Sequence, residues 1–484
     1  MTARTGSEYL VGLRDGREVW LNGERVADVT VHPALTGGAH SIAALYDLQH
    51  EAADVCLTPN PETGEPMNVS HLIPRSPADL ARRHAGIERI ARASVGLLGR
   101  SPDYVNVSLA GFAGRIDLWA TNANEAGAAN LVAFQKEVAR RDLCLTHALI
   151  NPTIDKSIPE WDAGGGEIVL HKVEDTANGI LVRGARTLAT LAPFADEMFV
   201  YPGQPLPKEA ARYALTFSIP MATPGLKVLC RDSFAVASNR YDHPFSSRFD
   251  EQDAVVIFDN VEVPRERVFL DGQPEIYGRV MAIGWAANAM QQTTIRAMVK
   301  LEFAYELATK MVEVTNAANP QTNELLGELW SYYELTRAAL RAAEADAREW
   351  GNGVWLPDER PFRALRPTLP RWFPRVNEII KLLGAHSLLA TPTAAELANP
   401  DLRPLIDRYY PGAKDIPAIE RIRVFRAAWD FAGTALAGRN ELYERFYLAS
   451  AARTYQMAHA MAQHERKDQP SLLDEMLTAM EDLP

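Results

Sequence analysis

The sequence predicts an α+β protein in which a strand-rich middle segment separates two helical segments. Apolar runs of strand length, separated by Gly and Pro, occur between residues 144 and 271. Before and after that segment, apolar residues recur at helical spacing. The 484 residues exceed what one hydrophobic core usually supports. We therefore expect three domains: an N-terminal, mainly helical one over 1–143, a β-barrel over 144–271 and a helical bundle over 272–484.

Composition argues against several classes of partner and site. The chain has 62 acidic and 50 basic residues, a formal net charge of -12, which argues against nucleic acid or an anionic membrane as its main partner. Cys56, Cys144 and Cys230 are far apart, so we expect neither a disulfide framework nor a cysteine-bound metal. No apolar stretch reaches the length of about 18 residues that a membrane span needs. We expect a cytoplasmic protein that binds a small molecule or another protein.

The first segment begins with a short ribbon and continues as helix. Asn22 and Gly23, between alternating apolar and polar residues, are typical of a hairpin turn. From Ser76 the apolar residues recur at helical spacing, which predicts a helix that ends near Gly99. A second helix is expected over 124–142.

The middle segment reads as a succession of strands. Asn178 and Gly179 give the strongest short hairpin signal in the chain, between apolar runs at 167–173 and 180–184. Further runs of strand length follow at 187–192, 198–201, 213–220, 226–230 and 254–263. This number of strands predicts a closed or nearly closed antiparallel barrel.

The last segment is predicted to be helical almost to its end. Candidate helices lie near 279–317, 323–351, 374–388 and 416–464. Long helices bury their apolar stripes against one another, so we expect a bundle. The tail after Lys467 is expected to dock on another subunit.

Common catalytic signatures are absent from the sequence. No Gly-x-Gly-x-x-Gly follows a strand, and the glycines at 164–166 precede a strand rather than a helix. The histidines form no His-x-x-x-His pair with an acidic partner, and there is no Gly-x-Ser-x-Gly elbow. These absences disfavour a nicotinamide site, a phosphate loop, metal-dependent hydrolysis and a catalytic triad.

Polar residues at chain breaks are the remaining candidates. Pro102 interrupts the helical pattern and leaves Arg100 and Tyr104 beside the break. His147 lies among apolar residues just before Pro152, which again stops regular structure. Taken alone, these residues are more typical of a helix end and of a packed core than of catalysis.

Six segments in unchanged order resemble the 4-hydroxyphenylacetate 3-hydroxylase family. They lie at 100–104, 146–155, 182–193, 241–251, 263–269 and 441–447, within a likeness that runs from about Tyr9 to about Gln463. The family comprises oxygenase components of two-component, reduced-flavin-dependent aromatic monooxygenases. The resemblance implies an acyl-CoA dehydrogenase-like fold, with a helical N-terminal domain, a middle antiparallel β-barrel and a C-terminal helical bundle, assembled as a homotetramer.

The resemblance also assigns site residues. It implies that Arg100, Tyr104 and His147 are catalytic and bind the substrate. FAD contacts are implied for His147, Ala148, Leu149, Thr153, Ile154, Asp155, Lys156, Thr190, Ala449, Ser450, Ala451 and Ala452. The family tends to have Gly-Asp-Pro where this chain has residues 449–451, which alters the details of those contacts. Residues 231–241 match a loop that closes over substrate in relatives.

The implied chemistry is hydroxylation of a phenol ortho to its hydroxyl group. A separate NAD(P)H:flavin reductase would supply FADH2 by diffusion, and FADH2 would react with molecular oxygen to give a flavin C4a-hydroperoxide. Arg100 would favour the phenolate, while Tyr104 and His147 orient the ring. Gly203 stands near where relatives use hydroxyl side chains to hold a substrate carboxylate. We therefore expect a phenol other than 4-hydroxyphenylacetate, either larger or attached to a carrier.

Three alternatives remain open. A halophenol or nitrophenol monooxygenase of the same family would carry histidines where Gln291 and Gln292 stand. A dehydratase of the 4-hydroxybutyryl-CoA type would need three cysteines and a histidine for an iron-sulfur cluster, and no cysteine follows Cys230. An inactive flavin-binding protein is disfavoured, because Arg100, Tyr104 and His147 occur together. The sequence does not name the phenol.

Overall fold

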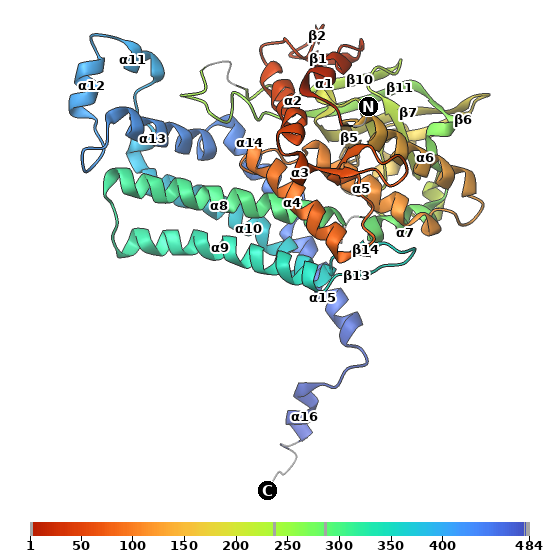
Figure 1. Cartoon of the computed structure of the whole chain (residues 1–484). Coiled ribbons are helices and arrows are strands. Elements are labelled where there is room, and N and C mark those ends of the chain that lie inside the picture. The colour runs from red at the N-terminus through yellow and green to blue at the C-terminus, as the bar shows by residue number, and fades with distance from the viewer. Residues whose placement is uncertain (1–2, 236–238, 285–287, 479, 481–484) are drawn as a thin grey trace.

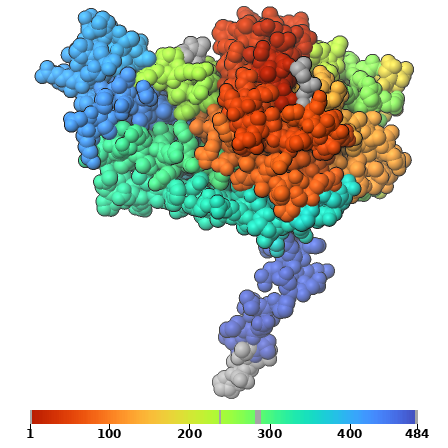
Figure 2. All heavy atoms as spheres, viewed as in Figure 1, coloured from red at the N-terminus to blue at the C-terminus, as the bar shows by residue number. Residues whose placement is uncertain are grey.

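The computed structural model describes residues 3–235, 239–284, 288–478 and 480. A mixed helical and sheet body lies beside a bundle of long helices, and the end of the chain projects from the body as an arm (Figure 1). Figure 2 shows the first part of the chain closely packed on the face in view, with the arm standing apart. The predicted α+β class is confirmed, because both helices and sheets form the core.

The N-terminal segment contains α1–α6 and β1–β4. Their bounds are α1 Gly6–Gly12, β1 Glu18–Leu21, β2 Glu24–Val26, α2 Thr36–Glu51, α3 Ala53–Cys56, β3 Leu57–Pro59, β4 Pro66–Asn68, α4 Pro77–Ala93, α5 Pro102–Gly114 and α6 Glu125–Arg141. The predicted hairpin is confirmed: Asn22 and Gly23 join β1 to β2 with φ angles of 53° and 81°. The predicted second helix corresponds to α6.

The connection between α4 and α5 differs from the prediction and creates the site. Ser76 caps α4 as expected, but the helix ends at Ala93 because Val95 and Gly96 adopt positive φ angles of 48° and 72°. Pro102 then begins a new helix, where a missing N–H costs nothing. Every residue of α5 is buried, so the helix lacks the polar stripe by which periodicity is recognised.

The middle strands form two sheets. Their bounds are β5 Leu145–Ala148, β6 His171–Asp175, β7 Gly179–Thr190, β8 Glu197–Val200, β9 Leu215–Pro220, β10 Leu226–Cys230, β11 Asp253–Pro264 and β12 Val268–Asp271. A six-stranded sheet has the order β2-β1-β10-β11-β7-β6, and a four-stranded sheet has the order β12-β9-β8-β5. The Thr146 hydroxyl donates to the Thr190 carbonyl at 2.6 Å, and a bridge between Ile150 and Thr187 also links the sheets.

The predicted antiparallel pairing of the middle strands is wrong for β5 and β8, and β1 of the N-terminal ribbon also joins the larger sheet in parallel. β1 pairs with β10, and β5 pairs with β8, in parallel register. Neither pair is joined by a hairpin, so turn chemistry does not fix its direction. The predicted hairpin between β6 and β7 is confirmed.

The C-terminal segment is mainly helical, as predicted. Its elements are α7 Pro274–Gly284, α8 Met290–Thr315, α9 Pro320–Ala345, β13 Arg348–Glu349, β14 Trp355–Leu356, α10 Glu359–Gly384, α11 Ala394–Ala398, α12 Arg403–Tyr409, α13 Ala418–Ala432, α14 Ala435–Phe446, α15 Ala451–Arg466 and α16 Leu472–Thr478. α10 begins well before the expected residue 374 and contains Pro367, Pro370 and Pro374. Buried Phe362, Leu369 and Phe373 keep this helix packed despite its prolines.

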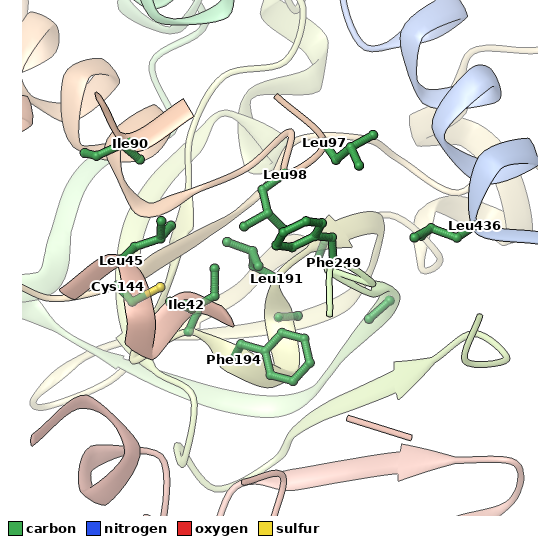
Figure 3. Packing of buried hydrophobic residues seen from close by; sticks show 14 of the residues in the cluster. Ile42, Leu45, Ile90, Leu97, Leu98, Cys144, Leu191, Phe194, Phe249 and Leu436 are labelled. Atoms are coloured by element: carbon green, nitrogen blue, oxygen red, sulfur yellow. The ribbon is translucent and has the colours of Figure 1, made fainter. Parts of the chain in front are cut away.

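One core cluster joins the three parts of the chain. Figure 3 shows Ile42 and Leu45 from α2, Ile90 from α4, Phe194 and Phe249 from the middle segment, and Leu436 from α14 around a shared interior. These side chains all belong to one buried cluster. Elements far apart in sequence are therefore fixed relative to one another around the connection between α4 and α5.

None of the helices described is both long enough and apolar enough to cross a bilayer. No group of three or more His, Cys, Asp or Glu side chains in the described parts of the chain is arranged to hold a metal ion.

Candidate active site

Arg100 and Tyr104 face each other at the start of α5. Their exposed fractions are 7% and 1%. The guanidinium carbon of Arg100 lies 3.9 Å from the centroid of the Tyr104 ring. A cation over an aromatic face is attracted by the ring electrons, most strongly where water is excluded. The two residues therefore form a buried pair, and neither is a solvated residue at a helix end.

His147 joins this pair from β5. Its ring centroid lies 5.5 Å from that of Tyr104 and 6.0 Å from that of Tyr201. Burial, and then the positive charge of Arg100, hold the pKa of His147 well below its usual value. The imidazole is therefore neutral near pH 7. The structure brings all three predicted catalytic residues together.

Arg100 and His147 each have one buried side-chain atom with no hydrogen-bond partner within the described chain. These atoms are Nδ1 of His147 and Nε of Arg100. Leaving a buried polar atom unpaired costs about 1–3 kcal/mol. Such atoms in a native structure usually serve a ligand or a bound water. The arrangement suits a small ligand with an aromatic ring and an anionic or hydrogen-bonding oxygen.

Residues that the sequence reasoning missed hold Arg100 in place. Glu251 accepts hydrogen bonds from the backbone N–H groups of Gly99 and Arg100 at 3.1 and 2.9 Å. Arg439 of α14 pairs with the same carboxylate at 2.6 Å. Nη1 of Arg100 donates to the Tyr443 hydroxyl, also on α14, at 2.6 Å. Tyr443 and Glu251 lie within matched segments, which is the only sequence signal that could have found them.

Thr190 belongs to the same polar network. Its hydroxyl donates to Asp253 at 2.7 Å, and Asp253 pairs with Arg439 at 2.6 Å. Burial alone would raise the pKa of Asp253, but the charges of Arg439 and Arg231 outweigh it and hold the pKa well below its usual value. Thr190 is thus connected, through Asp253 and Arg439, to Glu251, the carboxylate that holds the backbone of Arg100.

The other residues predicted to bind FAD lie at the periphery of this group. Ala148 is buried in β5, whereas Thr153, Ile154, Asp155 and Lys156 are exposed in the loop that follows it. Nη1 of Arg186 donates to the Leu149 carbonyl at 3.0 Å and to Asn151 at 2.5 Å. These bonds fix the start of the loop. The structure therefore places 153–156 at the surface.

Local geometry describes the segment 449–452 and Gly203, which are also assigned to the site. Ala449 has a φ of 69°, a backbone region that favours the glycine of the family pattern. Ser450 caps α15 by accepting from the N–H of Arg453. Nε of Arg366 donates to the Leu448 carbonyl at 2.8 Å. A side chain at Gly203 would place its Cβ 2.7 Å from the carbonyl oxygen of Leu149, so this glycine packs directly against the start of the loop.

Gln291 and Gln292 belong to contacts between helices. Gln291 accepts from Nε of Arg83 at 2.8 Å and donates to Glu344 at 2.6 Å. Gln292 donates to Asp103 at 3.0 Å. Both amides therefore support α4 and α5 from α8.

The predicted lid over 231–241 is described only at its two ends. Arg231 pairs with Asp250 at 2.6 Å and with Asp253 at 3.0 Å. The Tyr241 hydroxyl donates to the Ile419 carbonyl at 2.7 Å. Residues 236–238 of the lid lie outside the described residues.

Two family models match the chain. The model described as 4-hydroxyphenylacetate 3-hydroxylase N terminal matches residues 5–270. The model described as 4-hydroxyphenylacetate 3-hydroxylase C terminal matches residues 279–472.

Individual relatives agree with these matches. The 4-hydroxyphenylacetate 3-monooxygenase oxygenase component of Thermus thermophilus is 36% identical over 94% of this chain and 93% of its own length. The 4-nitrophenol 2-monooxygenase oxygenase component of a Rhodococcus species is 35% identical over 92% of this chain and 85% of its own length. A crystal structure of a 4-hydroxyphenylacetate 3-monooxygenase oxygenase component with FAD and 4-hydroxyphenylacetate has a TM-score of 0.92 at 34% identity, covering 99% of this chain and 100% of that one.

Proposed function

Because the chain belongs to the 4-hydroxyphenylacetate 3-hydroxylase family, we propose that Arg100, Tyr104 and His147 bind a phenol beside FADH2 for hydroxylation ortho to its hydroxyl group. The chain is the oxygenase component of a flavin-dependent aromatic monooxygenase that uses FADH2 and molecular oxygen. A separate reductase supplies the reduced flavin. One observation carries the residue assignment: Arg100 and His147 flank one buried aromatic ring, and each keeps an unpartnered polar atom.

The residues assigned to FAD fit its chemistry. Burial, and then the charge of Arg453, lower the pKa of Arg366 to about 10, so two cations converge beside residues 449–452. Converging cations favour an anionic group such as a pyrophosphate. Ile154, 61% exposed, offers apolar surface for a flat ring next to the buried group. We place FAD against 147–149, 153–156, Thr190 and 449–452.

The chain's own residues prepare the phenol for reaction. Reduced FAD, when bound, supplies electrons and activates molecular oxygen for transfer to the ring. Arg100 favours the phenolate, which makes the ortho carbon electron-rich. His147 is neutral, so a ring nitrogen can hydrogen-bond the phenol oxygen without adding a charge. Burial of Tyr104 and its neighbours excludes water from the oxygen transfer.

The phenol that we propose as substrate carries no carboxylate where the carboxylate of 4-hydroxyphenylacetate would lie. Gly203 offers no hydroxyl, and its contact with the Leu149 carbonyl leaves no room for one. Ring hydroxylation is favoured over displacement of a leaving group, because this chain has glutamines where the halophenol and nitrophenol relatives would carry histidines. The side chains of Gln291 and Gln292 are instead engaged by Arg83, Glu344 and Asp103.

We further propose a cytoplasmic homotetramer of three-domain subunits, divided at 143/144 and 271/272. The exposed apolar face of α16 supports assembly, since Leu472, Leu473, Met476 and Leu477 are 49–72% exposed. The bridge between Ile150 and Thr187 supports closure of the two middle sheets into a barrel. The free thiols of the three cysteines suit a reducing compartment.

Product identification with a supplied reductase tests the function. The purified chain alone is expected not to oxidise NAD(P)H. With a flavin reductase, FAD, oxygen and a panel of phenols, we expect an ortho-hydroxylated product by mass spectrometry. The methyl ether of each accepted phenol is the matched control, because it cannot ionise and should yield no product. Rapid NADH oxidation by the chain without a reductase, or equal hydroxylation of the ethers, contradicts the proposal.

A further inference from the structure

Arg100 is a buried cation whose side-chain partners in the described structure carry no negative charge. Its Nη1 donates to the Tyr443 hydroxyl at 2.6 Å, and its guanidinium carbon lies 3.9 Å from the Tyr104 centroid. The nearest carboxylate in the network, Glu251, accepts from the backbone N–H of Arg100 and pairs with Arg439 at 2.6 Å. Buried arginines are usually held by carboxylates, which neutralise them. Here a hydroxyl takes the place of the carboxylate.

The hydroxyl of Tyr443 is neutral. Burial raises the pKa of Tyr443 well above its usual value, and the charges of Arg100 and Arg296 oppose that rise only in part. The bond therefore orients the guanidinium and leaves its charge available to a ligand.

The position of Tyr443 is itself fixed by its neighbours. Its ring stacks on Tyr447 with centroids 4.6 Å apart and planes at 11°. The adjacent Glu444 receives two hydrogen bonds from Arg296, at 2.8 and 2.9 Å, and one from Lys300 at 2.9 Å. These ion pairs are buried and tie α14 to α8.

Gly99 provides the space that the Tyr443 ring occupies. A Cβ at this position would lie 2.3 Å from Cζ of Tyr443 and 2.4 Å from its hydroxyl oxygen. Real Cβ atoms do not approach so closely, so a larger residue at position 99 would displace the ring. The absence of a side chain at Gly99 therefore lets the Tyr443 hydroxyl lie directly beside the backbone that leads into Arg100.

We propose that Tyr443 is a positioning residue that holds Arg100 for phenolate binding without neutralising its charge. This inference rests on the proposed function, in which Arg100 binds the phenolate. Holding a flexible side chain in advance saves the entropy that its ordering would otherwise cost on binding. Tyr443 would therefore raise both the affinity for the phenolate and the fraction of bound phenol that is ionised.

Spectroscopic titration of 4-nitrophenol tests this role without turnover. The probe is bound to the chain in the presence of saturating oxidised FAD, and its phenolate absorbance is followed against pH. The parent should bind the phenolate and ionise it at lower pH than in free solution. Tyr443→Phe removes one hydrogen bond to a charged group, so we expect about tenfold weaker binding and an ionisation pH shifted toward the free value. Arg100→Met should abolish both effects.

Tyr447→Phe is the matched control, since it keeps the stacked ring next to Tyr443 and should behave as the parent does. Gly99→Ala should reproduce the effect of Tyr443→Phe by displacing the ring, with the hydroxyl still present. FAD affinity and melting temperature, measured on each variant, separate this effect from a general loss of structure. If Tyr443→Phe has a lower melting temperature than the parent, the affinity and ionisation pH of 4-nitrophenol measured with Gly99→Ala test the role of Tyr443 instead.

The outcomes distinguish this inference from the function on which it rests. If Arg100→Met binds and ionises 4-nitrophenol as the parent does, the proposed role of Arg100 is wrong and the role of Tyr443 falls with it. If Arg100→Met loses both effects while Tyr443→Phe and Gly99→Ala keep them, only the role of Tyr443 is overturned.

Discussion

Burial decides how His147 can act. The side chain is 5% exposed, and its pKa lies well below the usual value because of desolvation and the nearby Arg100. A neutral imidazole next to a permanent cation can donate or accept a hydrogen bond but does not compete for the phenolate charge. In the proposed function, Arg100 supplies the charge that stabilises the phenolate and His147 orients the phenol.

Removal of the His147 side chain should damage coupling more than oxygen consumption. We expect His147→Ala to consume oxygen with FADH2 but to release more hydrogen peroxide and several-fold less hydroxylated product, because the phenol is no longer held for transfer. Peroxide and product, measured together per oxygen consumed, check this. His171→Asn is the control, because His171 is a buried histidine bonded to the Val169 carbonyl outside the Arg100 group. Parental coupling in a stable His147→Ala variant would refute the assignment.

Between elements, an ionic contact connects α4 to α9. His84 of α4 lies 2.8 Å from Glu344 of α9 and 3.5 Å from Glu88 of its own helix. Burial lowers the pKa of His84, but hydrogen bonds to Glu344 and Glu88 outweigh it and raise the pKa to about 9. Glu344 also accepts from Gln291 of α8, so one carboxylate joins three helices.

This contact should make stability depend on pH in a defined direction. Since the folded pKa of about 9 exceeds the ordinary value of 6.5, folding gains stability that is fully present below 6.5 and is lost as pH rises through about 9. We expect His84→Gln to lower the free energy of unfolding by about 1–3 kcal/mol near pH 6 and by almost nothing near pH 10. Denaturant unfolding across this range measures the difference.

The exposed His50 of α2 provides the comparison for that experiment. His50→Gln should leave the pH profile of the parent unchanged, because this exposed side chain hydrogen-bonds a backbone carbonyl, that of Arg4 at 3.1 Å, and no carboxylate within the described residues. A destabilisation of His84→Gln that stays constant from about pH 6 to about pH 10 would show that His84 contributes packing and no charge.

For the whole molecule, the C-terminal arm raises the question of assembly, because α16 presents exposed apolar side chains. α16 extends away from the body (Figures 1 and 2), whereas α15 packs against α10, where Arg363 pairs with Glu465 at 2.7 Å. Leu472, Leu473, Met476 and Leu477 fall on one face of α16, where residues three and four apart are neighbours. Apolar surface of this kind is stabilised when another chain covers it.

Deletion of residues 468–484 should therefore weaken the proposed tetramer. We expect light scattering after size exclusion to give a smaller assembly for the truncated chain, with a melting temperature that depends on protein concentration. A variant with Glu475→Gln and Asp474→Asn, which keeps the apolar face, serves as the control and should assemble as the parent does. Retention of the full assembly after truncation would exclude the arm as a subunit contact.

The sequence by itself determined the local structure and the family. Asn22-Gly23 specified a hairpin and Ser76 a helix start, because turn and cap chemistry act over a few residues. The matched segments singled out Arg100, Tyr104 and His147, which the structure places next to one another. A short motif carries this information because the chemistry of a site restricts the residue types at each position.

Only the tertiary structure decided what surrounds those residues. Tyr443 is 343 positions from Arg100, and Arg439 is 188 positions from Glu251, so no local pattern records either contact. α5 escaped prediction because burial on every side removes periodicity, and the parallel pairs β1/β10 and β5/β8 have no connecting turn to set their direction. Long-range packing fixes these features, since their energy comes from surfaces that meet only after the chain has folded.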